Sequence, residues 1–430
     1  MCLMAMLLLM ATPMMAGEFN FGEALENFYS EMGFTSFFVG TGWKNLVMLG
    51  VGCVLLYLAI KKEYEPLLLL PIAFGMILTN LPGAGLFHTE MWNEEFLNPD
   101  SPYYHSYRHV LAEGGLLDIL YIGVKAGIYP CLIFLGVGAM TDFGPLIANP
   151  KSLLLGAAAQ LGIFATFIVT QMDIFGFTPN EAASIGIIGG ADGPTAIFTT
   201  IKLAPHLLGP IAIAAYSYMA LVPVIIPLVV KCLCSKKELM INMKEQDKLY
   251  PDAVQIKNMR VLKIVFPIAV TTIVAIFVPT AVSLVGMLMF GNLLKEIGND
   301  TFRLFDAASN GIMNAATIFL GLCVGATMTV DAFINVQTLG IVAGGFCAFA
   351  LSIASGICMA KVWNLFAKKK INPLIGATGL SAVPMASRVC NGISTQYDPK
   401  NHVLNYCMSS NISGVIGSAV AAGVLISYLG

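Results

Sequence analysis

The stretch 185–198, IGIIGGADGPTAIF, places one carboxylate, Asp192, inside an apolar and glycine-rich run. Gly193 and Pro194 follow it directly, and both residue types disfavour the interior of a helix. An isolated carboxylate is also costly in apolar surroundings. A sequence that accepts both costs at one position predicts an interrupted helix whose break holds a functional carboxylate.

The composition around this stretch is that of a membrane protein. Of the 430 residues, 57% are hydrophobic and only 11% are charged, whereas soluble domains carry roughly a quarter charged residues. We therefore expect an all-α polytopic membrane protein with roughly nine to eleven crossings. The net charge of −2 gives no indication of nucleic-acid binding. The ten cysteines form no metal-ligand framework.

Polar segments divide the chain into expected domains. Residues 1–40 are a signal-like or interfacial segment, in which 1–16 is either a cleaved signal, an interfacial piece or the product of a start codon placed too early. Residues 41–430 form the expected translocation domain. Within it, the external loop is 87–115, the first repeat core is 116–231, the lysine-rich cytoplasmic loop is 232–261 and the second repeat is 262–430.

The distribution of lysines also requires the interruption at Asp192. The positive-inside rule places Lys61, the lysine-rich loop and Lys368–Lys370 in the cytoplasm. The lysine-rich loop follows segment 204–231, so this segment must end in the cytoplasm. When the crossings are counted from cytoplasmic Lys61, this is possible only if segment 182–200 does not cross the membrane as one helix. Irregular backbone at membrane depth is tolerated only where protein buries it or where it lines a wet cavity.

Two pairs of similar motifs indicate a duplicated unit. LGVGAMTDF (135–143) is similar to LCVGATMTVDAF (322–333), which brings Asp142 and Asp331 to matching places, where both could lie at membrane edges. A glycine-rich break follows each motif, GGADGPTA (189–196) and GLSAVPMA (379–386). We therefore expect two pseudo-symmetric, inverted repeats with discontinuous helices at the membrane midplane, an arrangement that surrounds the central site in transporters.

Asp192 is the first candidate ligand for a sodium ion or a proton. Hard cations prefer carboxylate, hydroxyl, amide and carbonyl oxygens, and a broken helix supplies carbonyl groups that have lost their helical partners. Thr195 adds a hydroxyl group to this set. The alternative is that Asp192 caps the N-terminus of a half-helix.

A second polar cluster occupies INPLIGATGLSAVPMASRVCNG (371–392). Asn372 precedes Pro373, a pair that is typical of a helix start. Ser381 and Arg388 are seven residues apart and would share one face if the segment were helical. Arg388 needs an acidic partner or an anionic ligand in an apolar run, unless it extends from a helix end to the membrane surface.

A third cluster, MSSNISGVIGSA (408–419), is rich in small residues that allow close helix packing. Close packing does not account for Asn411, because a buried amide must find hydrogen-bond partners. Tyr218 is either an interfacial anchor or a residue that faces the site. The small residues of the cluster are Ser409, Ser410, Ser413, Gly414, Gly417 and Ser418.

The motifs GIIGGADGPTAIF, NPLIGATGLSAVPMASR and QYDPKNHVLNYCMSSNISGVIGSAVAAGVL resemble the beta subunit of the sodium-translocating biotin-dependent decarboxylases, from about residue 40 to the C-terminus. That family includes oxaloacetate, methylmalonyl-CoA, glutaconyl-CoA and malonate decarboxylases. The resemblance implies that the chain decarboxylates carboxybiotin on a partner and couples this step to sodium export with consumption of a proton. It also implies that the chain is not active alone.

The partners implied by the resemblance are a biotin carrier subunit or domain, a carboxyltransferase alpha subunit and a small membrane gamma or delta subunit, in an oligomeric complex of the bacterial cytoplasmic (inner) membrane. Lys244 in INMKEQ lacks the Met-Lys-Met motif of a biotin carrier, so no covalent biotin is expected on this chain. The chain also has no G-x-x-x-x-G-K-[ST] motif for ATP binding.

The resemblance assigns roles to seven residues. Asp192 matches the key aspartate of the family, and Tyr218 matches a tyrosine implicated in proton handling. The expected catalytic residues are Asp192, Tyr218, Ser381 and Arg388; the expected contacts to carboxybiotin are Arg388, Asn372 and Gly376; and the expected sodium ligands are Asp192, Asn411, Ser381 and Asn372.

Two other functions use the same features differently. A free-standing sodium-coupled secondary transporter of organic anions would need the same broken helices and cation ligands. A structural scaffold would leave Asp192 without a role. The resemblance also implies that the carboxyltransferase, and not this chain, selects the acid or acyl-CoA that is decarboxylated.

Overall fold

The computed structural model describes residues 33, 37, 42–62, 66–172, 176–250, 258–329, 336–382 and 385–430, without the side chains of residues 219, 220, 336, 337 and 339. The described ranges are helical and contain no β-strand, which confirms the expected all-α fold. The predictions for residues 1–40 fall almost entirely outside the described residues, and so does the one for Asp331.

Seven helices of the described part are long and apolar enough to cross a membrane. Two further bent pairs would raise the number to nine, the lower end of the expected range. The seven are α4 (Trp43–Lys61), α10 (Ser152–Ala159) continued by α11 (Leu161–Thr170), α18 (Met259–Phe277), α19 (Val282–Ile297), α20 (Phe302–Asp306) continued by α21 (Met313–Ala326), α23 (Val336–Phe366) and α26 (Leu404–Leu429).

The two bent pairs lie in the region 116–231 that the sequence assigns to the first repeat core, with the second pair ending just beyond it at Leu233. Helices α7 (Leu116–Lys125) and α8 (Ile128–Met140) meet at 66°, and the connecting Gly127 has a φ of +72°, which favours glycine. Helix α14 (Leu208–Ala220), entered through η3 (Pro205–Leu207), meets α15 (Val222–Leu233) at 67°. Helix α5 (Pro66–Thr79) is a shorter apolar helix.

The first predicted break is present. Helix α12 (Pro179–Gly186) continues as η2 (Ile187–Gly190), and α13 (Gly193–Leu203) starts after Asp192. Ala191 has a φ of +54°, a left-handed conformation that is unusual for a residue with a Cβ. The sequence signal of glycine, aspartate and proline therefore marks a true interruption of the helix in the middle of the apolar stretch.

The second break separates α24 (Pro373–Ala377) from α25 (Met385–Tyr397). Ser381 lies in the connection, and Arg388 lies on α25. The condition under which these two residues would share one helical face is therefore not met, because no continuous helix joins them. Residues 383 and 384 of this break are outside the described ranges.

Helices α5 and α21 cross with their backbones in contact. A Cβ atom on Gly75 would lie 2.2 Å from the carbonyl oxygen of Leu322, and one on Gly325 would lie 2.0 Å from that of Ile72. Glycine is therefore required at both positions, as at other close helix crossings in membranes. The Asn80 amide completes the crossing by donating to the Met328 carbonyl at 2.9 Å.

Helices α19 and α8 cross in the same way. A Cβ on Gly291 would lie 1.9 Å from the Leu135 carbonyl oxygen, and one on Gly138 would lie 1.8 Å from that of Leu288. Here the Asn292 amide donates to the Thr141 carbonyl at 3.0 Å. Each crossing thus joins an early helix of one half of the chain to a helix of the other half, with equal spacing of the contact residues.

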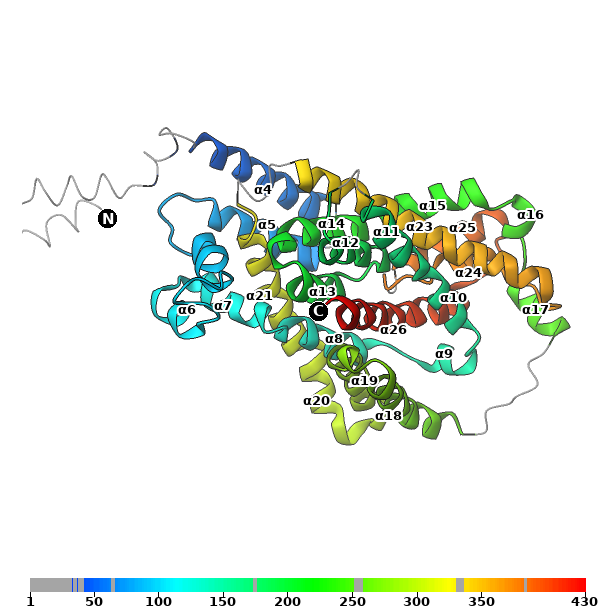
Figure 1. Ribbon diagram of the computed structural model, residues 1–430. Helices are drawn as coiled ribbons and strands as arrows, with labels where there is room; N and C mark the ends of the chain where they lie inside the picture. Colours follow the sequence, from blue (N-terminus) through cyan, green and yellow to red (C-terminus); the bar gives the residue numbers. More distant parts are fainter. Residues whose placement is uncertain are drawn as a thin grey trace, which may run out of the picture.

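Polar segments lie at opposite ends of the helix bundle (Figure 1). One end carries η1 (Met91–Phe96) and α6 (Tyr107–Glu113), which are anchored by the fully buried Asp118. Its carboxylate accepts hydrogen bonds from the Trp92 indole at 2.8 Å and from His88 Nδ1 at 2.7 Å. The other end, called the lysine-rich end below, carries α16 (Lys236–Leu239), α17 (Met243–Leu249) and Lys368–Lys370.

Candidate functional site

Asp192 is buried where the first break meets two other elements, with 6% of its surface exposed. Its Oδ1 accepts a hydrogen bond from the Thr195 backbone N–H at 3.2 Å, so Asp192 does cap α13. Its Oδ2 accepts from the hydroxyl groups of Ser381 at 2.9 Å and Ser418 at 2.8 Å. The cap is therefore only part of its role, because two further hydroxyl groups converge on the other oxygen.

The two breaks also touch through their backbones. The Ser381 N–H donates to the Gly190 carbonyl at 3.0 Å. Ser381 therefore binds the first break twice, through its backbone to Gly190 and through its side chain to Asp192. A carboxylate, hydroxyl groups and broken backbone meet at one buried point, and these are the oxygen donors that a hard cation prefers.

Asn411 does not hydrogen-bond to Asp192. Its Nδ2 donates to the Leu380 carbonyl, and its Oδ1 accepts from the Ser387 hydroxyl at 3.4 Å. Asn411 therefore holds the second break against α26. The residue of α26 that reaches Asp192 is Ser418, seven positions further along the same face of the helix. The sequence interpretation treated Ser418 only as a small packing residue, although its spacing from Asn411 was a usable signal.

The two tyrosines of α14 face different neighbours. The Tyr218 hydroxyl donates to the Val342 carbonyl of α23, and its ring approaches Phe346 at 6.2 Å between centroids. Tyr216 is 1% exposed and packs on the first break, since a Cβ on Gly193 would lie 2.1 Å from its ring. The tyrosine that touches the break is thus Tyr216, which the sequence interpretation did not single out.

Asn372 and Gly376 hold α24 in place rather than binding Asp192. The Asn372 Oδ1 caps α24 at the Leu374 N–H, and its Nδ2 donates to the carbonyls of Leu239 at 2.9 Å and Ile241 at 3.1 Å. Both polar atoms of the side chain are thereby used. Gly376 packs directly on α23, where a Cβ would lie 2.1 Å from the Gly356 carbonyl oxygen.

Arg388 is exposed on α25. Within the described residues we find no ion pair or hydrogen bond of its side chain, so it does not neutralise Asp192 there. Its guanidinium group is available to an anionic ligand or to the membrane surface. The structure thus brings Ser381 to Asp192 and leaves Arg388 apart from it.

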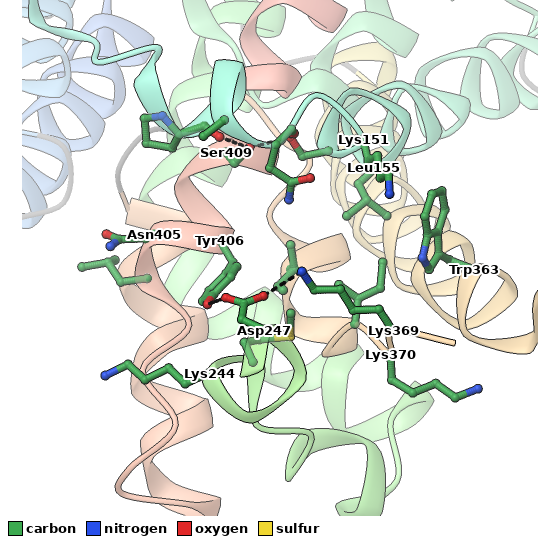
Figure 2. A pocket seen from close by; sticks show the side chains of 18 of the residues that line it. Lys151, Leu155, Lys244, Asp247, Trp363, Lys369, Lys370, Asn405, Tyr406 and Ser409 are labelled. Carbon is green, nitrogen blue, oxygen red and sulfur yellow. Dashed lines mark hydrogen bonds and ion pairs between the residues drawn. The ribbon is translucent and has the colours of Figure 1, made fainter. Parts of the chain in front are cut away.

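A cavity of about 990 Å³ opens at the lysine-rich end. Figure 2 shows Tyr406 and Lys369 reaching Asp247 within it, the lysine at 2.8 Å. The exposed residues that line it include Lys151, Lys244 and Lys368, and the buried ones include Ser152, Leu155 and Ser409. The cavity therefore combines a cationic mouth with a partly apolar inner end.

Helices α10 and α26 connect the inner end of the cavity with Asp192. The hydroxyl groups of Ser152 and Ser409, which both line the cavity, are hydrogen-bonded to each other. Further along, a Cβ on Gly156 of α10 would lie 2.1 Å from the Ser413 hydroxyl of α26. The nine residues from Ser409 to Ser418 correspond to about 13 Å along the helix. A continuous row of small and polar residues thus runs from the cavity to the carboxylate.

The described residues contain no group of three or more His, Cys, Asp or Glu side chains that could hold a metal ion. The donors around Asp192 are instead a single carboxylate, hydroxyl groups and carbonyl oxygens. This set fits a hard monovalent cation better than a transition metal, which prefers imidazole and thiolate ligands.

Comparison with known proteins identifies the family. Residues 44–429 match the family described as the Na+-transporting oxaloacetate decarboxylase beta subunit. The chain is 52% identical over 409 residues to the methylmalonyl-CoA decarboxylase subunit beta of Propionigenium modestum, covering 95% of this chain and all of the relative.

Two further relatives show the same relationship. The oxaloacetate decarboxylase beta chain of Klebsiella pneumoniae is 47% identical over 422 residues, covering 89% of this chain and 94% of the relative. The glutaconyl-CoA decarboxylase subunit beta of Acidaminococcus fermentans is 46% identical over 411 residues, covering 95% and 99%. Together with the buried carboxylate between two helix breaks, these similarities show that the chain belongs to the family of beta subunits of the sodium-transporting decarboxylases.

Proposed function

We propose that this chain decarboxylates carboxybiotin presented by a partner's carrier and couples the reaction to sodium export. The observation that carries the proposal is the position of Asp192, buried between two helix breaks and contacted by Ser381 and Ser418. A deeply buried carboxylate in a membrane protein is expensive and marks an ion or proton pathway. Sodium would be held by Asp192, these hydroxyl groups and carbonyl oxygens of the breaks.

The chemistry sets the balance of protons. When the C–N bond of carboxybiotin breaks, carbon dioxide leaves and the electron pair stays on the biotin nitrogen, which takes up one proton. A proton and a sodium ion compete for Asp192, because a protonated carboxyl group loses its charge and most of its attraction for the cation. Decarboxylation can therefore be coupled to exchange of the two cations at one side chain.

The cavity at the lysine-rich end is the proposed entrance for carboxybiotin. Its volume of about 990 Å³ suits a small-molecule group. Exposed Lys151, Lys244 and Lys368 would attract an anionic carboxylate and an acidic carrier surface. Arg388 would favour the same anion from α25. By the positive-inside rule this end, with the loop 232–261, faces the cytoplasm, and 87–115 faces outward.

We infer that the membrane domain consists of two inverted repeats, 116–231 and 262–430. The support is the matched glycine crossings and the matched order of elements. In the first half α8 is followed by α10–α11, a broken helix and α14; in the second half α21 is followed by α23, a broken helix and α26. Motion of one set of elements against the other would move the site between the two sides.

The complex would contain the carboxyltransferase alpha subunit, the biotin carrier and a small gamma or delta subunit, in the bacterial cytoplasmic membrane. The relatives' names as beta subunits or chains support a multi-subunit complex. A second candidate function is a free-standing sodium-coupled transporter of organic anions, which the lysine-lined cavity would also suit. Sodium-dependent anion uptake by the chain alone, in vesicles, would favour that second function.

The decisive experiment uses the complete complex reconstituted in vesicles. Asp192→Asn keeps the size of the side chain and removes its charge. We expect the variant complex to assemble normally and to lose sodium-stimulated decarboxylation and sodium uptake. Normal pumping by Asp192→Asn would refute the proposed role of the carboxylate, and failure of the natural complex to respond to sodium would refute the proposed function itself.

A further inference from the structure

Gln160 is a buried amide at the junction of α10 and α11, with 5% of its surface exposed. Its Nε2 lies 3.2 Å from the Gly156 carbonyl oxygen, 3.4 Å from that of Gly379 and 3.4 Å from that of Gly414. These carbonyls belong to α10, to the second break and to α26. The donor end of Gln160 therefore faces three elements that surround the Asp192 site.

The acceptor end of the same side chain has no donor. Gln160 Oε1 is fully buried and accepts no hydrogen bond within the described residues. It faces the first break, because a Cβ on Gly190 would lie 3.6 Å from it. A buried amide oxygen without a donor is costly, and the cost is removed if a cation or a water molecule binds to the oxygen.

Gln160 lies between the cavity and Asp192. It follows the cavity residues Ser152 and Leu155 by eight and five positions, which corresponds to about 12 Å and about 8 Å along the axis of α10. A Cβ on Gly417 would lie 3.1 Å from the Gln160 side chain, and the next residue, Ser418, donates to Asp192. An ion that moves from the cavity along α10 and α26 therefore passes Gln160 before it reaches the carboxylate.

We propose that Gln160 Oε1 is a ligand for the transported sodium ion on the cavity side of Asp192. This inference rests on the proposed function, and it adds a second ligand position to the path. The amide oxygen is neutral, so it can hold the cation briefly without trapping it. The Thr195 hydroxyl, fully buried on the Asp192 side of the first break, gives the ion a next oxygen donor.

The experiment compares variants that keep or remove the oxygen. Gln160→Glu keeps an oxygen and loses the amide donor, whereas Gln160→Met removes both at similar length. In the purified complex we measure sodium binding with radioactive sodium at equilibrium, and the sodium concentration that half-saturates decarboxylation. We expect Gln160→Met to weaken sodium binding about tenfold, and Gln160→Glu to keep or strengthen the binding.

Gln160→Asn supplies a variant for the case in which Gln160→Met does not fold. It withdraws the oxygen by one methylene group and should weaken sodium binding to an intermediate degree. The matched control is Asn292→Leu at the α19–α8 crossing. The Asn292 amide resembles that of Gln160: its Nδ2 donates to the Thr141 carbonyl, and its Oδ1 accepts no hydrogen bond from the described residues. It should lower thermal stability and leave sodium binding unchanged.

Two results would overturn the inference. If Gln160→Met and Gln160→Glu lower the thermal midpoint equally and leave sodium binding at the natural value, Oε1 only binds a structural water molecule. If Gln160→Glu weakens sodium binding as much as Gln160→Met, the amide donor and not the oxygen matters. In either result the natural complex and Asp192→Asn still test the proposed function separately.

Discussion

The Ser381 hydroxyl lies 2.9 Å from the Asp192 carboxylate, although the two residues are 189 positions apart in the chain. Each comes from a helix break, and the Ser381 backbone also binds the first break at Gly190. A movement of either break therefore changes the environment of the carboxylate directly. If Asp192 binds an ion as proposed, this contact would transmit the change at the carboxylate to the second half of the protein.

Removal of either hydroxyl donor should weaken the sodium site. We expect Ser381→Ala and Ser418→Ala each to raise the half-saturating sodium concentration about tenfold, or about 1.4 kcal/mol, because each removes one oxygen ligand of the proposed sodium site. The measurement is a sodium titration of decarboxylation by the purified complex. Ser355→Ala is the control, since that half-buried hydroxyl bonds only within its own helix among the described residues. Unchanged sodium dependence in both site variants would contradict the assignment.

Competition between a proton and sodium at Asp192 predicts a specific pH dependence. As the pH falls and the carboxyl group becomes protonated, the half-saturating sodium concentration should rise, approaching about tenfold per pH unit once the protonated form predominates. The test is a set of sodium titrations over a range of pH values at constant ionic strength. A half-saturating concentration that is independent of pH down to the limit of stability would show that the two cations do not share this group.

Arg388 should act through its charge on an anionic ligand. We expect Arg388→Ala to slow decarboxylation of carboxybiotin more than Arg388→Lys does, because lysine keeps the charge but loses the planar two-point contact. The readout is release of carbon dioxide from the carboxylated carrier at saturating sodium. Equal effects of the two substitutions would indicate that the shape of the guanidinium group matters and its charge does not.

The lysines at the cavity mouth should control recognition of the carrier. Lys244→Glu and Lys368→Glu each reverse one exposed charge of the lining. We expect both to raise the KM for the carboxylated carrier, most strongly at low ionic strength, where charges are least screened. Lys237→Glu makes the same change at an exposed residue of α16 that does not line the cavity. An equal rise in KM for Lys237→Glu would show that only the total charge of this end matters.

The two glycine crossings should respond alike to a single methyl group. Gly138→Ala and Gly325→Ala place a Cβ 1.8 Å and 2.0 Å from a carbonyl oxygen, so the helices must separate. We expect each to lower the free energy of unfolding by about 1–3 kcal/mol or more, measured by thermal unfolding in detergent. Gly50→Ala is the control, because nothing lies within 4 Å of a Cβ there. If the free energy of unfolding of both variants equals that of Gly50→Ala, the helices can separate to accept a methyl group without loss of stability.

The sequence predicted those parts of the fold that depend on local residues. Hydrophobicity identified the helices, and glycine and proline beside Asp192 identified the first break. The second break was located, but the sequence left open whether Ser381 and Arg388 share one helical face, and the structure places Ser381 in the connection and Arg388 on α25. Local sequence patterns predict where a helix ends better than they predict where the next helix begins.

The partners of Asp192 were harder to predict because they depend on tertiary packing. Ser381 was expected, but Ser418 was not, and neither was the packing of Tyr216 on Gly193 beside the carboxylate, since serine and tyrosine in apolar helices are more often packing residues or interfacial anchors. Asn372 and Asn411 have strong polar character in the sequence, yet the structure uses both to hold backbone segments. A polar residue in lipid surroundings must be satisfied, and sequence alone does not distinguish a backbone carbonyl from an ion as its partner.

The exchange of helices between the halves bears on how the protein is made. Helix α5 packs against α21, which is synthesised more than 200 residues later. Helix α8 packs against α19, which is synthesised about 150 residues later, so both early helices lack these partners until the second half is made. Until then their glycine-lined surfaces are open to lipid or to insertion factors. Assembly of the first half is thus completed only when the second half enters the membrane, and a chain truncated after α15 would be left without its closing contacts.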